Sequence, residues 1–274
     1  MRQRAVLYVY FDRPEDAGEA SHSFNIEGLA AALRGDGEPP VVICVHARDI
    51  AELSDEEIRG RYGALALFIA GSFTEWFQYG SDPSFRATVD GVAPLLRHTQ
   101  VPMLAVCGGH QLLAAAEHGF GAVAHMTAGQ GHVRIAEELA LPAPRSLAPE
   151  PRWGQEGTYA LALTAEASVD PVFSLLGAGS AWVSQHHKDM VVNIEGATLL
   201  GTDDATRPAR TSASHQTTCH VQAVRWAGRP ACYGVQFHPE VPRFREATSD
   251  DAGTGAELIC AFVARARRVQ GARD

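Results

Sequence analysis

The chain has 274 residues, of which 46% are hydrophobic and 20% are charged, and its formal net charge at pH 7 is −9. This length and apolar content are enough to bury a full hydrophobic core. The acidic balance argues against a surface that binds nucleic acid or an anionic membrane, because no basic stripe offsets phosphate repulsion. No apolar run reaches the roughly 18 residues that a membrane-spanning helix needs. We therefore expect a globular protein that binds neither partner.

The five cysteines, at positions 44, 107, 219, 232 and 260, form no Cys-x-x-Cys pair. An odd, scattered set fits a reducing compartment better than a disulfide framework. The N-terminal apolar run from Ala5 to Phe11 is short and has no cleavage site of small residues after it, so it is typical of a first strand and not of a signal peptide. We expect a cytoplasmic location.

Strand-like and helix-like segments alternate along the first 118 residues. The predicted strands are 5–11, 40–45, 65–70 and 102–106, and the predicted helices are 25–34, 50–60, 82–97 and 110–118. Alternation of this kind predicts a mostly parallel sheet with helices on both faces and with functional loops at the carboxyl edge of the strands.

The later part of the chain changes character. Residues 131–135, 158–163, 198–201 and 220–226 alternate between apolar and polar side chains, which is typical of antiparallel strands. Residues 220–226 and 231–237 are predicted to form a hairpin, and residues 255–269 a last helix. The fold class is therefore α/β, with a mostly parallel central sheet flanked by helices and a smaller antiparallel subsheet.

We expect one domain over residues 1–274 with two loop insertions. The first, near 139–157, is rich in proline, and the second, near 203–219, is rich in Ser, Thr and Ala. Each insertion is either a simple surface loop, which is our preferred interpretation, or a lid or partner-docking segment.

Cys107 follows the apolar run 101–106 and precedes Gly108 and Gly109. The pattern is similar to a nucleophile elbow, a sharp strand-to-helix turn that needs small residues around the nucleophile, here Ala105 and Gly109. At the N-terminus of the following helix, backbone N–H groups and the helix dipole favour a thiolate. The alternative is a buried core cysteine, but a core cysteine needs no Gly-Gly pair behind it.

His238 and Glu240 lie two residues apart after the last predicted strand. Pro239 favours an extended conformation at His238, and an extended i, i+2 pair projects its side chains to the same side. Glu240 can then orient one ring nitrogen of His238 while the other nitrogen faces a nucleophile. Cys107, His238 and Glu240 complete a triad in principle.

Together these two segments resemble the signatures of the class I, or triad, glutamine amidotransferases, Cys-x-Gly-x-Gln and Gly-Val-Gln-Phe-His-Pro-Glu. They correspond here to Cys107 to Gln111 and Gly234 to Glu240. The resemblance implies a flavodoxin-like core, a catalytic role for the triad, a substrate-seating role for Gln111, and no cofactor.

The loop that begins at Gly71 stands where this family has a glycine-rich loop. By resemblance, the backbone N–H groups of Gly71 and Gly108 form the oxyanion hole. The sequence Gly71-Ser72 departs from the family's usual Gly-Gly-Pro or Gly-Pro-Gly and is closer to the corresponding sequence of related γ-glutamyl hydrolases and peptidases. Phe73 and Trp76 either cap the core or contact the substrate.

Residues 181–191 resemble the family's segment that grips the α-amino and α-carboxylate groups of glutamine. This resemblance assigns substrate contacts to His186, His187 and Asp189. Two adjacent histidines also suggest a metal site, but no Cys or carboxylate falls at a familiar zinc spacing, so we expect no metal.

These features favour a cysteine-dependent glutamine amidotransferase. It would hydrolyse the glutamine side-chain amide through a γ-glutamyl thioester and supply ammonia to a separate synthase, because the chain carries no ATP-binding or other acceptor motif. One alternative is a free-standing γ-glutamyl hydrolase or peptidase, which the Gly71-Ser72 sequence favours. A second alternative is a catalytically silent regulatory subunit, which would have little need to retain all three triad side chains.

Overall fold

The computed structural model describes residues 4–13, 15–16, 19–34, 39–76, 78–126, 132–139, 155–176, 180–204, 219–241 and 254–272. Within these residues the chain forms a nine-stranded sheet in the order β2-β1-β3-β4-β12-β11-β10-β7-β8. The strands of this sheet are β1 (Ala5–Tyr10), β2 (Val41–His46), β3 (Ala64–Ile69), β4 (Met103–Val106), β7 (Gln155–Leu163), β8 (Ser180–His187), β10 (Ala197–Asp203), β11 (Ala223–Trp226) and β12 (Cys232–Val235).

The sheet has a parallel half and an antiparallel half. The neighbours from β2 through β1, β3 and β4 to β12 pair in parallel. From β12 through β11, β10 and β7 to β8 every pairing is antiparallel. Strand β12 therefore joins the two halves, and its carboxyl end lies beside that of β4.

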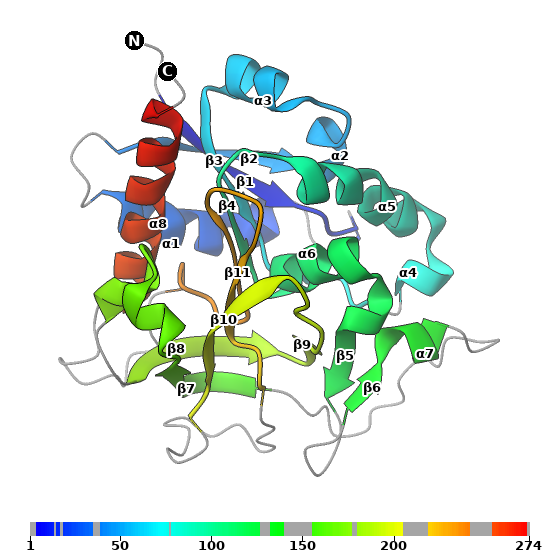
Figure 1. Ribbon diagram of the computed structural model, residues 1–274. Helices are drawn as coiled ribbons and strands as arrows, with labels where there is room; N and C mark the ends of the chain where they lie inside the picture. Colours follow the sequence, from blue (N-terminus) through cyan, green and yellow to red (C-terminus); the bar gives the residue numbers. More distant parts are fainter. Residues whose placement is uncertain are drawn as a thin grey trace.

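Helices cover both faces of the sheet, with α1 and α8 on one side of the parallel strands and α5 and α6 on the other (Figure 1). The α-helices are α1 (Ser23–Leu33), α2 (Ala47–Ile50), α3 (Asp55–Tyr62), α4 (Gln78–Ser81), α5 (Pro83–His98), α6 (Gly108–His118), α7 (Ile135–Leu139) and α8 (Thr254–Gly271). Short 3-10 helices cover Glu19–His22, Phe120–Ala122, Glu166–Val169 and Phe173–Leu176.

Apolar side chains explain this layering. All six residues of β3 are buried, as expected for a central parallel strand covered on both faces. Helix α5 buries positions 85, 88, 89, 92, 95 and 96, a spacing that places one stripe of side chains against the sheet. It begins at Asp82, whose carboxylate accepts hydrogen bonds from the backbone N–H groups of Ser84 and Phe85.

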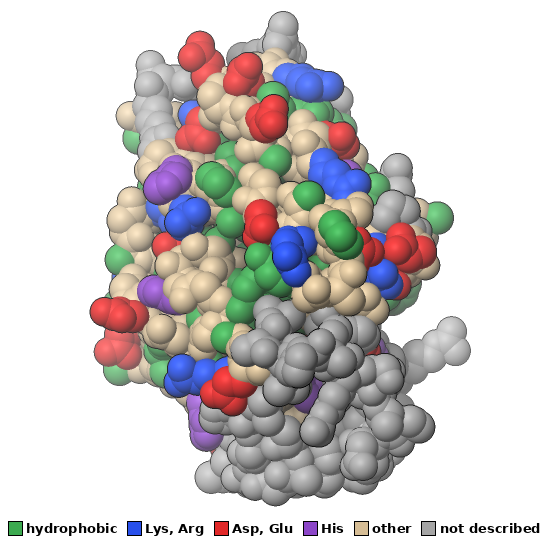
Figure 2. All heavy atoms as spheres, turned by 90° about the vertical axis from the view of Figure 1, so that its right-hand side faces the viewer, with side chains coloured by type: hydrophobic (Ala, Val, Ile, Leu, Met, Phe, Trp, Pro, Cys, Tyr) green, Lys and Arg blue, Asp and Glu red, His purple; other side chains and the backbone are tan. Residues whose placement is uncertain are grey.

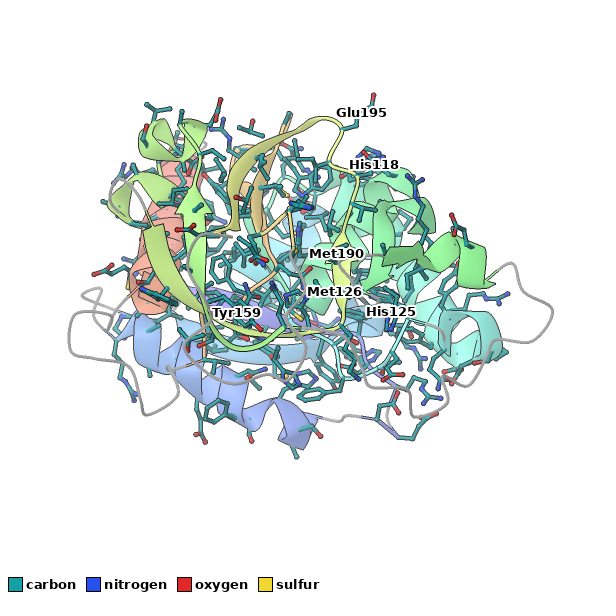
Figure 3. All side chains as sticks on the ribbon, turned by 90° about the horizontal axis from the view of Figure 1, so that it is seen from below. His118, His125, Met126, Tyr159, Met190 and Glu195 are labelled. Atoms are coloured by element: carbon teal, nitrogen blue, oxygen red, sulfur yellow. The ribbon has the colours of Figure 1, made fainter. Side chains whose placement is uncertain are left out.

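A second, three-stranded sheet has the order β6-β5-β9 and lies beside α6 and α7 (Figure 1). Its strands are β5 (Val123–Met126), β6 (His132–Arg134) and β9 (Asp189–Val191). Met126 and Met190 lie next to each other in this region and pack with Cys219 (Figure 3). The loop after β9 is held on α6 by a 2.9 Å hydrogen bond from the His118 ring to the carbonyl of Glu195 (Figure 3).

The predicted fold class is confirmed, and so is the predicted hairpin, which β11 and β12 form. The predicted helix 50–60 is wrong, because it is two helices, α2 and α3. Ser54 begins the second one by accepting a hydrogen bond from the Glu57 backbone N–H while the Glu57 side chain accepts from the Ser54 backbone. The strand predicted over residues 131–135 corresponds to β6, which ends at Arg134, and Ile135 begins α7.

Most of both predicted insertions, residues 140–154 and 205–218, lies outside the described residues. Residues 155–157, which we assigned to the first insertion, belong to β7. The prediction of one domain with two inserted loops therefore stays a prediction.

The charged side chains on the face seen in Figure 2 are interspersed, with Lys and Arg next to Asp and Glu. Among the described residues, no helix combines the length and the apolar character that crossing a membrane requires.

Gly109 offers a test of how closely α6 packs on β3. A Cβ atom added at Gly109 would lie 2.4 Å from the carbonyl oxygen of Ile69, whereas one added at Gly60 in α3 would meet no atom within 4 Å. We expect Gly109→Ala to lower the free energy of unfolding by about 1–3 kcal/mol through overpacking. The matched Gly60→Ala should raise it by about 0.5–1 kcal/mol through helix propensity. Urea denaturation measures both, and equal effects of the two substitutions would contradict this packing.

Candidate active site

Cys107 occupies a strained turn between β4 and α6. Its backbone angles are φ 49° and ψ −113°, and it is the one non-glycine residue with positive φ in the described part of the chain. This conformation is costly for an L-residue with a side chain, and such outliers gather at functional sites. The Cys107 N–H donates to the carbonyl of Val235 at 2.8 Å, and its own carbonyl accepts the first helical hydrogen bond, from Gln111 N–H, at 3.0 Å.

The two glycines after Cys107 are needed for close approach. Gly109 lies against the end of β3, and a Cβ atom added at Gly108 would lie 2.6 Å from the backbone nitrogen of Ser72. The sharp turn therefore forms only because the residues behind the cysteine have no side chains. This is the elbow geometry that the Gly-Gly pair predicts.

His238 and Glu240 follow β12, the parallel neighbour of β4. The His238 Nδ1 and Glu240 Oε1 atoms are 2.8 Å apart, and the Glu240 side chain is fully buried. The His238 N–H donates to the carbonyl of Ser184 at 2.9 Å, which fixes the segment on β8. The sequence predicts an extended conformation here, but residues 239–240 form a turn, closed by a 3.3 Å hydrogen bond from Val241 N–H to the His238 carbonyl.

The His238 ring lies close to the side chain of Cys107, whose sulfur acts on the charge of the ring. Both residues flank Gly71, where an added Cβ atom would lie 2.9 Å from His238 Cε1 and 3.4 Å from Cys107 Cβ. Burial opposes a charge on His238, but the carboxylate of Glu240 and the sulfur of Cys107 outweigh it and raise the pKa of His238 well above its usual value. An imidazolium beside a thiolate is the charge arrangement that a cysteine nucleophile uses.

The two aromatic residues of the loop that begins at Gly71 have different surroundings. Trp76 is buried in the core at 2% exposure, and its Nε1–H donates to Gln111 Oε1 at 2.7 Å. Phe73 is 53% exposed. Of the two interpretations left open for this pair, core capping therefore describes Trp76, whereas Phe73 stands in solvent.

Gln111 is buried on the first turn of α6 and is held by protein groups at both ends of its side-chain amide. The oxygen accepts from Trp76, and the nitrogen donates to the carbonyl of Asp189 at 2.7 Å and to the side-chain oxygen of Gln236 at 3.3 Å. This residue ties the loop after Gly71 to the segment after β8. Its role in seating a substrate stays a prediction.

The two adjacent histidines have different surroundings. His186 is exposed, and its backbone carbonyl lies 3.7 Å from Cys107 Sγ. His187 is buried, with Nδ1 donating to the carbonyl of Asp189 at 2.9 Å. The Asp189 carboxylate contacts Nδ1 of His125 at 2.7 Å. The segment 186–189 therefore borders Cys107, and the substrate contacts expected of these residues stay predictions.

A buried polar network lies behind His187. Its Nε2 lies 3.0 Å from the side-chain oxygen of Gln155, and that oxygen accepts a hydrogen bond from Gln222 at 2.9 Å. Both glutamines donate to the carboxylate of Asp203. Burial lowers the pKa of His187 to about 3 and raises the pKa of Asp203 to about 6.

Sequence reasoning missed this network and a second buried acid, Asp12. Asp12 directly follows the apolar run 5–11, at the carboxyl edge of the sheet, and this place in the sequence indicates a candidate functional residue. Gln155 and Asp203 fell within regions that we assigned to loops. Among the described residues, no group of three or more His, Cys, Asp or Glu side chains is arranged to hold a metal ion.

Comparisons with known proteins bear on this arrangement. The family model for class I glutamine amidotransferases matches residues 80–248, more than half of the chain and including Cys107, His238 and Glu240. The chain belongs to this family. A comparison with the curated proteins finds no match.

Solved structures of similar fold support the architecture of this class I amidotransferase. A protein from Thermoplasma acidophilum that is named for GMP synthase has 15% identity and a TM-score of 0.60 over 99% of this chain and 97% of its own. A glutamine amidotransferase from Methylobacillus flagellatus and the glutaminase domain of Trypanosoma brucei CTPS with bound acivicin each have 16% identity and a TM-score of 0.54. Each match covers 97% of this chain and 94% of the other. At these identities the likeness shows the fold alone.

The raised pKa of Asp203 predicts a pH dependence of stability. In the unfolded chain an Asp titrates near about 3.9, so the folded state binds the proton more tightly between that value and pH 6. The stability that Asp203 contributes is therefore present below about pH 4 and is lost as the pH rises through 6.

Asp203→Asn should remove this dependence. Lost hydrogen bonds shift the unfolding free energy of the variant by the same amount at every pH. On raising the pH from 4.5 to 8, we expect the unfolding free energy of the variant to increase by about 2 kcal/mol relative to that of the wild type. Urea titrations at the two pH values measure the change, with the exposed Asp49→Asn as the matched control. A difference between variant and wild type that is the same at both pH values would contradict the assignment.

Proposed function

We propose that this amidotransferase is a cysteine-dependent glutaminase in which Cys107, His238 and Glu240 act as a triad. The observation that carries the proposal is the placement of a strained, helix-capping Cys107 against a His238 ring that is held by Glu240 at 2.8 Å. Cys107 is the N-cap residue of α6, so the positive end of the helix dipole and the first backbone N–H groups of the helix lie beside it.

The first half-reaction forms a thioester. The Cys107 thiolate attacks the side-chain amide carbon of glutamine, the C=O π electrons move to oxygen, and a tetrahedral oxyanion results. The His238 imidazolium gives its Nε2 proton to the amide nitrogen, the C–N bond breaks, and ammonia leaves. The C=O bond re-forms, which leaves a γ-glutamyl thioester on Cys107 and a neutral His238.

The second half-reaction returns the thiol. His238 takes a proton from water as the water oxygen attacks the thioester carbon, and a second tetrahedral oxyanion forms. Its collapse breaks the C–S bond, releases glutamate and leaves the thiolate beside the imidazolium. Glu240 orients the ring and stabilises its charge throughout, without itself being protonated.

The backbone N–H groups of Gly71 and Gly108 are the proposed oxyanion donors. Both residues adjoin the reacting atoms, since Gly71 lies against Cys107 and His238 and Gly108 follows the nucleophile. Each donor of this kind contributes about 3 kcal/mol in enzymes where one has been removed. Gln111 is proposed to seat the substrate from the first turn of α6. His186, His187 and Asp189 are proposed to hold its α-amino and α-carboxylate ends.

We further propose that the ammonia passes to a separate synthase. The names of two structural neighbours support this proposal, since one is named as a subunit of GMP synthase and the other as the glutaminase domain of CTPS. The single catalytic unit proposed here would work in the cytoplasm without a cofactor, and its acceptor reaction would lie on the partner chain.

Steady-state release of glutamate from glutamine tests the proposal. We expect Cys107→Ala to lower kcat at least about 10³-fold, because it removes the attacking atom. Cys44→Ala, on β2 away from the elbow, is the matched control and should retain wild-type turnover. Activity that survives in Cys107→Ala would contradict the assignment of the nucleophile.

The same assay separates the alternatives. Weak glutamine turnover that rises when a synthase partner is added is the result expected of an ammonia-supplying amidotransferase. Cys107-dependent hydrolysis of γ-glutamyl peptides in preference to glutamine would instead indicate the free-standing hydrolase, which the Gly71-Ser72 sequence favours. If no substrate is turned over in a thiol-dependent reaction, the result would indicate the catalytically silent regulatory subunit.

The orienting carboxylate can be tested separately. Glu240→Gln keeps the shape of the side chain but removes the charge that stabilises imidazolium, so we expect kcat to fall about 10²-fold or more. The exposed Glu166→Gln controls for a general effect of removing an acid. Equal turnover in the two variants would show that Glu240 does not orient His238.

A further inference from the structure

Asp12 is a buried carboxylate that the proposed chemistry does not use. It lies two residues after β1, is 2% exposed, and faces the loop that begins at Gly71. Burying an ionised carboxylate is costly unless hydrogen bonds compensate it. The groups that compensate Asp12 therefore indicate what it holds in place.

One carboxylate oxygen of Asp12 accepts three hydrogen bonds from consecutive residues of this loop. The donors to Oδ1 are the Ser72 hydroxyl and the backbone N–H groups of Phe73 and Thr74, each at 2.7 Å. The backbone of Arg13 returns a fourth contact, from its N–H to the Thr74 hydroxyl at 3.0 Å. Burial alone would raise the pKa of Asp12, but the hydrogen bonds from His22, Ser72 and Thr74 outweigh it and lower that pKa.

The other oxygen of Asp12 ends a buried chain of side chains. His22 Nε2 lies 3.0 Å from Asp12 Oδ2, and His22 Nδ1 lies 3.0 Å from the hydroxyl of Tyr8. Burial raises the pKa of Tyr8 far above its usual value, so Tyr8 keeps its proton and can donate it to Nδ1. His22 then donates from Nε2 to Asp12, and the carboxylate is held from both sides.

The loop held by Asp12 contacts the reacting groups directly. Backbone and Cβ atoms of Ser72 fill the space where a side chain at Gly108 would stand, and His238 and Cys107 fill the space at Gly71. The loop from Gly71 to Trp76 contains no proline that would restrict its backbone. Gly71 thus begins, and Gly108 packs on, a loop in which one carboxylate binds three consecutive residues.

We propose that Asp12 is a positioning residue for the oxyanion hole, acting through Ser72, Phe73 and Thr74, with His22 and Tyr8 as its support. This inference rests on the proposed glutaminase function, because only an acyl-transfer step creates an oxyanion at that place. It predicts a defect confined to steps that need the oxyanion hole.

Two reactions of Cys107 separate positioning from general damage. Glutamine hydrolysis passes through a tetrahedral oxyanion, whereas alkylation of the thiolate by iodoacetamide displaces iodide at a saturated carbon and needs no oxyanion hole. For Asp12→Asn we expect kcat for glutamine to fall about 10- to 100-fold, the loss typical of a misplaced catalytic group. KM should change less than about threefold, and the alkylation rate of Cys107 should stay at the wild-type value.

Asp16→Asn is the matched control, since Asp16 is a nearby acid that pairs with Arg13 and leaves the loop untouched. Ser72→Ala removes one of the three donors to Oδ1 and keeps the Cβ atom that packs on Gly108. It should lower kcat in the same direction by a smaller factor, and it decides the question if Asp12→Asn does not fold.

An unchanged kcat in Asp12→Asn, or a parallel loss of kcat and alkylation rate, would overturn the positioning role while the wild-type activity stands. If the wild-type chain hydrolyses no glutamine although iodoacetamide labels Cys107, the proposed function itself fails, and the inference that rests on it is rejected with it.

Discussion

The backbone conformation of Cys107 is the constraint on which the rest of the site depends. A φ of 49° at a residue with a side chain is tolerated because the surrounding structure leaves no alternative. Strand β4 fixes the approach, the carbonyl of Val235 holds the Cys107 N–H, and Gly109 allows α6 to close against β3. The same turn makes Cys107 the N-cap residue of α6, so the strained backbone and the helix N-terminus meet at the proposed nucleophile.

The two halves of the large sheet divide the work around that turn. The parallel half supplies the elbow, the loop after Gly71 and, through Asp12, the anchor of that loop. The antiparallel half supplies the partners, because the β11–β12 hairpin delivers His238 and β8 supports it through the carbonyl of Ser184. Strand β12 pairs in parallel with β4 and antiparallel with β11, so it is the element that brings the two sets of residues together.

The sequence was most informative where chemistry depends on local pattern. An apolar strand followed by Cys107-Gly108-Gly109 predicts an elbow, and a histidine and a glutamate two residues apart predict a dyad, although Pro239 forms a turn there instead of extended chain. Long-range contacts left weaker traces. The small sheet pairs β5 with β9 across more than 60 residues. The groups that hold Asp12, directly or through His22, come from positions 8, 22 and 72–74. No local periodicity encodes such contacts, so they emerge only when the chain is folded.

The measurement that tests the central claim most directly is mass spectrometry of the chain after rapid mixing with glutamine and quenching in acid, followed by proteolysis. We expect a γ-glutamyl group on the peptide that contains Cys107, formed at the rate of the first ammonia release and absent from Cys107→Ala. Release of glutamate with no covalent adduct on Cys107, or with the adduct on another residue, would contradict the role assigned to the elbow.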